Sequence, residues 1–257
     1  MSRYVRYTAL KTIVIREITR FTRIWPQTVL PPAITMTLYF IIFGNLIGSR
    51  IGRMEGYSYM EFITPGLIMM SVITSSYANV VSSFFSMKFQ RSIEEILIAP
   101  VPYYIILIGF VTGGVARGLL VGLIVSIISI FFTGLHIDNL LITSVVILLT
   151  AILFSIAGMI NAVFARNFDD ISIIPTFVLT PLTYLGGVFY SISLLPEFWQ
   201  GVSMANPILY MINAFRYGVL GISDINIAAA FFIILLFITV LGSATLYLLK
   251  TGRGIRS

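Results

Sequence analysis

Apolar segments of membrane-spanning length alternate with short charged segments along most of the chain. The apolar runs cover about 24–47, 62–85, 103–132, 140–164, 171–190 and 226–249. A helix needs about 20 mostly apolar residues to cross the hydrocarbon core of a bilayer. The pattern therefore predicts an all-α integral membrane protein with six transmembrane helices.

The first 23 residues follow a different pattern, in which apolar residues recur at roughly helical spacing between basic ones. This pattern predicts an amphipathic helix that lies in the membrane interface, with Lys and Arg toward anionic headgroups. A disordered basic leader is the alternative. A signal peptide is not expected, because the segment has neither a continuous apolar core nor a small-residue cleavage site.

Two of the predicted spans carry unusual residues. The segment 62–85 is rich in serine and also contains Asn79, so one face should meet protein or a cavity rather than lipid. The segment 103–132 has Gly114, Gly118 and Gly122 at four-residue spacing, which predicts close helix packing. Arg117 lies in the same segment and could be functional, structurally paired or snorkelling toward the interface.

The segment 171–190 is apolar but is interrupted by Pro175, Pro181 and Gly186–Gly187. It is followed by short apolar helical pieces over 192–220, none of them long enough to span a bilayer. A rigid anchor would not need these interruptions. We therefore expect the region from Ile171 to Leu220 to form the outer half of a transport path.

Composition and charge agree with a membrane protein. Hydrophobic residues make up 58% of the 257 residues and charged residues 10%, with a mean hydropathy of +1.00. Twelve Lys and Arg residues fall in the leader, in 86–102, at Arg166 and after residue 249, whereas Arg50, Arg53 and Arg216 fall in the opposite loops. Basic residues mark cytoplasmic loops, so both termini are predicted to be cytoplasmic, and the net charge of +6 does not indicate a nucleic-acid partner.

The sequence offers little chemistry for catalysis. It has no cysteine, one histidine (His136) and no P-loop motif, so no disulfide, multi-histidine metal site or bound nucleotide is expected in this chain. The pairs Glu94–Glu95 and Asp169–Asp170 are interpreted as a solvated or protein-docking face and as a helix N-cap, rather than as catalytic carboxylates. Because the predicted spans contain no carboxylate at mid-depth, energy from another chain is favoured over ion coupling.

Several motifs together resemble the permease subunit of type-2 ABC exporters, the ABC-2 membrane protein family. They lie in order at Phe62–Leu67, Glu94–Pro102, Ala165–Asp170, Pro181–Tyr190 and Leu195–Trp199, then at Asn206–Pro207 and Phe215–Gly218. Each is weak alone, but their order and spacing are specific. The chain is most similar to small bacterial members related to nodulation-factor, drug-resistance and polysaccharide exporters.

The resemblance implies two copies of this chain paired with two copies of a separate ABC ATPase, which would bind ATP and Mg²⁺. It also implies that 86–102 is the coupling helix and that the leader contacts the ATPase as well. An apolar face of Ile93, Ile96 and Leu97 would be covered by the ATPase, and Arg91, Glu94 and Glu95 would meet its charged residues. No cofactor or metal is expected in this chain itself.

The resemblance further places the substrate path between the two copies, along the first, second and fifth spans. The implied path residues are Ser75, Asn79, Thr176, Thr180, Thr183 and Tyr184. The implied outer gate consists of re-entrant helices over 192–220, with Pro196, Phe198, Trp199, Asn206, Pro207 and Arg216. Aromatic residues near Tyr184 could contact an amphipathic substrate or simply pack at the dimer seam.

The function expected on these grounds is export of an amphipathic drug, lipid or glycan across the bacterial inner membrane. A secondary carrier or channel working alone is one alternative. A membrane scaffold without transport activity is the other.

Overall fold

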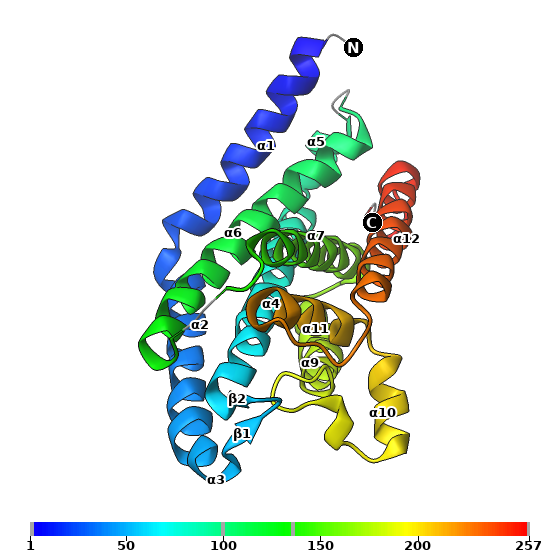
Figure 1. The fold of residues 1–257 in the computed structure, drawn as a ribbon. Coiled ribbons are helices and arrows are strands. Elements are labelled where there is room, and N and C mark those ends of the chain that lie inside the picture. Colours follow the sequence, from blue (N-terminus) through cyan, green and yellow to red (C-terminus); the bar gives the residue numbers. More distant parts are fainter. Residues whose placement is uncertain (1–2, 99–100, 135–136, 256–257) are drawn as a thin grey trace.

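A computed structural model describes residues 3–98, 101–134 and 137–255, without the side chains of Asn45 and Leu97. His136 and Pro100 lie outside the described residues. The described chain is almost entirely helical and contains one β-hairpin, whose two strands have two residues each (Figure 1). Five of its helices are long and apolar enough to span a membrane: Trp25–Ile51, Tyr59–Phe89, Tyr103–Phe132, Leu140–Phe164 and Ile227–Thr251. The protein is thus an all-α integral membrane protein, as the sequence predicts.

The N-terminal part forms two helical segments and the hairpin. Helix α1 (Arg3–Arg23) packs along α6, and α2 (Trp25–Tyr39) continues into the π-helix η1 (Phe40–Ile47) and α3 (Gly48–Ile51). The helix runs through Pro31–Pro32 without ending there. Strands β1 (Arg53–Met54) and β2 (Tyr57–Ser58) enclose Glu55–Gly56, both with positive φ, as a two-residue hairpin turn requires.

Helix α4 (Tyr59–Phe89) is the centre of the bundle. Ser58 and Glu61 form a reciprocal capping box, which satisfies backbone N–H groups at the N-terminus of the helix and fixes its start. Helices α6, α7 and α11 all pack against α4, and most of its residues are buried. The predicted segment 62–85 is therefore three to four residues too short at each end, and its polar residues face protein.

Helices α6 (Tyr103–Phe132) and α7 (Leu140–Phe164) coincide with the predicted segments. The predicted glycine packing on α6 is confirmed. A Cβ atom at Gly118 would lie 1.9 Å from Ser76 Oγ of α4, and one at Gly114 would lie 2.3 Å from Ser155 Oγ of α7. Only glycine lets the three helices approach this closely.

The fifth apolar segment is shorter and less regular than predicted. It comprises α8 (Asp170–Ile174), the π-helix η2 (Pro175–Leu179) and α9 (Thr180–Leu185), and it ends at Gly186–Gly187 rather than at Tyr190. Asp170–Leu185 extends roughly 24 Å at 1.5 Å per residue. Gly187 has a φ of +77°, which stops the helix.

The remaining chain forms the short helices η3 (Ile192–Leu194) and α10 (Glu197–Met204), followed by α11 (Pro207–Leu220) and α12 (Ile227–Thr251). Helix α11 packs against α4, α7 and α12. Asn206 and Asn226 cap the N-termini of α11 and α12 with their side-chain oxygens, and Gly221 and Gly252 end both helices in the left-handed conformation.

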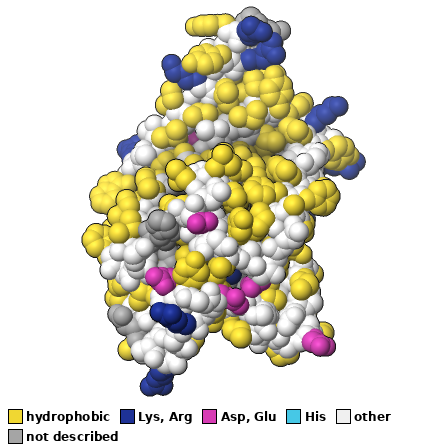
Figure 2. Space-filling model, in the orientation of Figure 1, with side chains coloured by type: hydrophobic (Ala, Val, Ile, Leu, Met, Phe, Trp, Pro, Cys, Tyr) yellow, Lys and Arg dark blue, Asp and Glu magenta, His cyan; other side chains and the backbone are white. Residues whose placement is uncertain are grey.

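The turns gather at two ends of the bundle. At the end that we call the basic end, Lys88, the 165–166 turn and Gly254 line one cavity. At the other, the distal end, Tyr57 Oη donates to Leu220 O (2.6 Å), and Asn139 N donates to Gly218 O (2.8 Å). Figure 1 shows the start of α1 and α5 in the upper part of the molecule and the hairpin, α3 and α10 in the lower part. In the same view, hydrophobic side chains cover much of the surface between these two parts (Figure 2). Asp170–Leu185 begins at the basic end and leads to Gly187, which lies against Arg216, and to Val188, which lies against Gly66 in the first part of α4.

Candidate functional site

The predicted coupling helix is α5 (Ser92–Ile98), shorter than the predicted segment 86–102. Ile93 is 1% exposed and packs in the core of its own protomer, and Ile96 also packs against that core. Ile93 is therefore covered by its own bundle, and coverage of the exposed part of Ile96 by a partner stays a prediction. The side chain of Leu97 lies outside the described residues.

The outward face of α5 carries a different set of side chains. Arg91 and Glu95 are exposed, Glu94 is half-buried, and Ile98 is 83% exposed. Sequence reasoning missed Ile98, because helical periodicity alone groups it with neither face of so short a helix. The surface that α5 offers to a partner is therefore mostly charged, with Ile98 as its apolar element.

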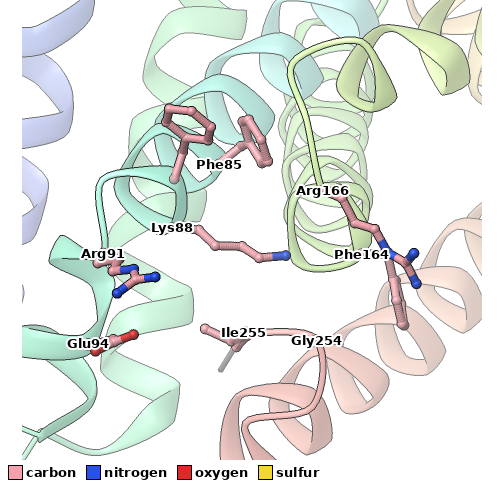
Figure 3. A pocket seen from close by; sticks show the side chains of 9 residues that line it. Phe85, Lys88, Arg91, Glu94, Phe164, Arg166, Gly254 and Ile255 are labelled. Carbon is pink, nitrogen blue, oxygen red and sulfur yellow. The ribbon is translucent and has the colours of Figure 1, made fainter. Parts of the chain in front are cut away.

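A cavity of about 490 Å³, which we call the basic-end pocket, lies beside α5 (Figure 3). Its charged lining consists of Lys88, Arg91, Arg166 and Glu94. Lys88 Nζ donates to Val163 O and Ala165 O, the terminal carbonyls of α7. A cation at a helix C-terminus is favourable because it faces the negative end of the helix dipole. Lys88 therefore links the C-terminal end of α4 to that of α7 at the wall of the pocket.

The turn between α7 and α8 is held by Asp170. Its carboxylate accepts from Arg166 N (2.7 Å) and Asn167 N (3.3 Å), and these backbone N–H groups, Arg166 first, hold the pKa of Asp170 below its usual value. Asp169 occupies the N-cap position but makes no side-chain capping hydrogen bond. Asp169 is thus at the predicted N-cap position, but neither aspartate side chain caps the helix. The side chain of Asp170 instead binds the turn that precedes the helix.

A buried carboxylate links α1 to the centre of the bundle. Glu17 is 0% exposed and accepts from Ser83 Oγ of α4 (2.7 Å). Arg20 lies with its Nε 3.7 Å from Glu17 and donates to Asn79 Oδ1 (2.9 Å). Burial lowers the pKa of Arg20, and the negative charge of Glu17 opposes that shift. Arg117 lies near Arg20, and its Nε is buried without a hydrogen-bond partner among the described residues.

Two of the predicted path residues lie inside the protomer. Asn79 is 0% exposed and is bound to Arg20 of α1, and Ser75 is also buried. A path between two copies would need both side chains at the protomer surface, but they face other helices of the same chain. The sequence correctly indicated a non-lipid neighbour for Asn79, and that neighbour is α1.

The first and fifth segments share an aromatic cluster, which we define as Tyr39, Phe43, Tyr184 and Phe189. The ring centroids of Phe43 and Phe189 are 4.7 Å apart, and the hydroxyls of Tyr39 and Tyr184 are 3.2 Å apart. Tyr184 is exposed. Most of α2 and η1 is also exposed, since only a small part of Trp25–Ile51 is buried in the protomer. The aromatic cluster therefore lies beside an apolar face that the protomer itself leaves uncovered.

The predicted threonines of the fifth segment differ in placement. Thr176 is exposed, Thr180 is half-buried and donates to Pro175 O (2.9 Å), and Thr183 is buried and donates to Leu179 O (2.6 Å). The hydroxyl of Thr183 satisfies its own helix. Thr183 is therefore a packing residue, and the surface of this segment is formed by Thr176, Tyr184 and the exposed Phe177.

The predicted gate residues fall into an exposed and a buried group. Pro196, Phe198 and Trp199 are exposed at the start of α10. Asn206 is buried, caps α11 and donates to Leu182 O (2.6 Å), and Pro207 occupies the first turn of α11. The buried group therefore fixes α11 against α9, and the exposed group is free to contact the membrane or another chain.

Arg216 is the largest fully buried side chain of the described part, with 1% exposure. Its guanidinium donates to Gly187 O, lies 3.9 Å from Asp224 Oδ2 and stacks 4.0 Å from the ring centroid of Phe62. Asp224 in turn accepts from Ser191 Oγ (2.6 Å). Arg216 therefore joins the distal ends of α4, α9 and α12, and it does not lie on the exposed surface of the predicted gate. Asp224 was missed, because nothing in the sequence pairs it with a residue of α11.

The comparisons with known proteins agree with this architecture. A model of the family described as ABC-2 type transporter matches residues 8–220. The chain belongs to the ABC-2 type transporter family. It is 60% identical to the inner membrane transport permease YadH of Escherichia coli K12, over 99% of both chains. It is also 26% identical to nodulation protein J of Rhizobium leguminosarum, over 79% of both chains, and 27% identical to that of Rhizobium meliloti, over 72% of this chain and 71% of the other.

Membership of the ABC-2 family makes this chain a membrane permease component rather than an enzyme in its own right. The family match includes α1 and ends at the last residue of α11. The α5 surface, the aromatic cluster, α10 and α11 thus fall inside the ABC-2 region, whereas Asp224 and α12 lie beyond it.

Proposed function

We propose that this chain is the permease subunit of an ATP-driven exporter in the bacterial inner membrane, acting as a homodimer with a separate ABC ATPase. The observation that carries the proposal is the ABC-2 family match over residues 8–220, together with 60% identity to an inner membrane transport permease. The chain has no P-loop motif of its own, so hydrolysis falls to the partner.

The proposed orientation places the basic end in the cytoplasm. Lys88, Arg91, Arg166, Lys250 and Arg253 all belong to segments at this end, which fits the excess of basic residues in cytoplasmic loops. In this orientation Asp170–Leu185 is the fifth of six crossings. Its length is below the roughly 30 Å of hydrocarbon, and local bilayer thinning or snorkelling residues can accommodate that mismatch.

The proposed docking surface for the ATPase is the outward face of α5. Glu95 and Ile98 are exposed there. Ile93 of α5 is buried in the core of the bundle, and α5 contacts α4. A displacement of α5 by the ATPase would therefore move the end of α4 as well. Lys88 extends that connection to the end of α7.

The proposed substrate path follows the exposed face of α2, η1, η2 and α9, with the aromatic cluster at its centre. Tyr184 and Phe177 offer apolar rings, and the tyrosine hydroxyls add a polar edge. This combination suits an amphipathic substrate such as a drug, a lipid or a glycan-bearing lipid. The π-helix η1 contributes Phe43 to the cluster and η2 directly precedes α9, and such irregular turns recur at functional sites.

The test is co-purification with an ATPase. An affinity-tagged chain is purified from its native membrane, and bound proteins are identified by mass spectrometry. We expect an ABC ATPase with the wild type and its loss with the double variant E94K/E95K, because the reversed charges would meet the basic residues expected on the partner. The control variant R53E changes charge at the distal end and should keep the ATPase. Normal co-purification and export by E94K/E95K would contradict the coupling assignment.

A further inference from the structure

The basic-end pocket carries more positive than negative charge. Lys88 and Arg91 reach it from the end of α4 and the turn that follows, Arg166 reaches it from the turn after α7, and Glu94 is the one carboxylate among the described lining residues. Asp170 also lies near Lys88, but one oxygen of its carboxylate, Oδ2, accepts from the backbone N–H groups of the 166–167 turn. Lys88 Nζ uses two of its three donors on carbonyls and keeps one for another acceptor. The pocket therefore favours an anion.

Arg91 is held in a conformation that favours glycine. It directly follows the C-cap Gln90 of α4 and has a φ of +59°. The residues that end α11 and α12 in the same left-handed conformation, Gly221 and Gly252, are both glycines. An arginine at such a position is disfavoured by its Cβ atom, and strained residues of this kind cluster at functional sites. The strain indicates that the side chain of Arg91 has a use that glycine could not supply.

Aromatic rings border the same cations. Phe85, Phe89 and Phe164 line the pocket, and the last two are each 60% exposed. They lie at the ends of α4 and α7, two helices of membrane-spanning length, which places them at the level of the lipid headgroups. Figure 3 shows Lys88 reaching across the pocket below the ring of Phe85, with Arg91 on the same side as Glu94. Cations beside exposed rings at this depth suit a headgroup phosphate with acyl chains attached.

We propose that the basic-end pocket binds the phosphate of an anionic phospholipid from the adjacent leaflet. Arg91 and Arg166 supply the charge at the mouth, Lys88 supplies the inner donor, and Phe89 and Phe164 contact the acyl region. Free inorganic phosphate shares the headgroup chemistry but would not use the exposed rings. The pocket would thus fix α5 and the α7–α8 turn relative to the membrane surface. The proposal concerns lipid binding and stands apart from the ATPase assignment.

The test uses the full chain in detergent and counts bound lipids by native mass spectrometry after addition of phosphatidylglycerol or phosphatidylcholine. The wild type should retain phosphatidylglycerol in preference to phosphatidylcholine. Arg91→Gly should weaken that binding about fivefold, and Arg166→Gln should do so by a similar factor, since each basic residue near an anionic surface contributes about that much. Arg53→Gln, a change at an exposed arginine in the hairpin of the distal end, is the matched control and should bind as the wild type does.

Arg91→Gly also separates binding from folding, because glycine relieves the left-handed strain. Its melting temperature should equal or exceed that of the wild type while phosphatidylglycerol binding falls. Equal retention of both lipids by the wild type would overturn the proposal. So would unchanged phosphatidylglycerol binding in Arg91→Gly with loss of ATPase co-purification, which would make Arg91 a docking residue. A rise in the melting temperature of the chain with inorganic phosphate but not with phosphatidylglycerol would likewise show that the ligand is not the lipid.

Discussion

Replacement of Arg216 with methionine is the most informative single perturbation of the distal end. Methionine keeps a long unbranched stem but removes the guanidinium. The change leaves the oxygen of Gly187 without this donor and leaves Asp224, whose side chain is 14% exposed, without its cation. The stacking on Phe62 is lost as well. The contacts between the ends of α4, α9 and α12 are thus all weakened at once.

The size of the effect follows from burial. Removal of one partner of a buried ion pair costs about 3–5 kcal/mol, because the other charge remains without compensation. For a chain of this length, each kcal/mol shifts the melting temperature by about 2–4 °C, so Arg216→Met should melt roughly 10 °C lower. Most of the loss should come from the charge of Asp224, whose carboxylate would keep only the hydrogen bonds from Ser191 Oγ and Ile192 N. The double variant R216M/D224N should therefore be more stable than R216M alone.

The assay is thermal unfolding of the purified chain in a mild detergent. Arg53→Met, an exposed arginine in the hairpin of the same end, is the matched control and should change stability by less than about 0.5 kcal/mol. If Arg216→Met melts with the wild type, Arg216 does not hold the distal end together. If R216M/D224N is less stable than R216M, the stranded carboxylate is not the cause.

Three further predictions concern the inner contacts and the basic end. Glu17→Gln weakens the charged hydrogen bond from Ser83 and should cost about 1–3 kcal/mol in the same unfolding assay; an unchanged midpoint would contradict it. Gly158→Ala places a Cβ atom 2.6 Å from a backbone oxygen of α4 and should cost about 1–3 kcal/mol, whereas Gly201→Ala, in open space, should not destabilise. Asp170 has a lowered pKa, so its contribution is present above its unfolded pKa of about 4 and is lost as pH falls through its folded value; Asp170→Asn should remove this acid step from the stability profile.

The long spans could be predicted because their signal is local. The segments 103–132 and 140–164 are uniformly apolar and bounded by polar turns, and the helices α6 and α7 agree with them at both ends. The fifth segment was predicted too long, because hydropathy does not register the left-handed turn at Gly187. The span thus ends where backbone conformation, not polarity, changes.

The site residues depended on contacts that no local pattern encodes. A helical pattern shows that Ile93 lies on an apolar face, but it does not say whether α4 or a partner covers that face. In the same way, the polarity of Asn79 required a neighbour, and only the packing of α1 against the bundle identifies it as Arg20. Arg216 and Asp224 are paired across a turn for the same reason.

The most direct test of the central claim is a site-specific photocrosslink from the two ends of the molecule. A photoreactive amino acid is placed at Glu95 on α5 or at Phe198 on α10, both exposed, and the crosslinked partners are identified from native membranes. The account predicts a crosslink to an ABC ATPase from position 95 and none from position 198. An ATPase crosslinked from position 198, or none from position 95 in a complex that contains it, would contradict the assignment of α5 as the coupling surface.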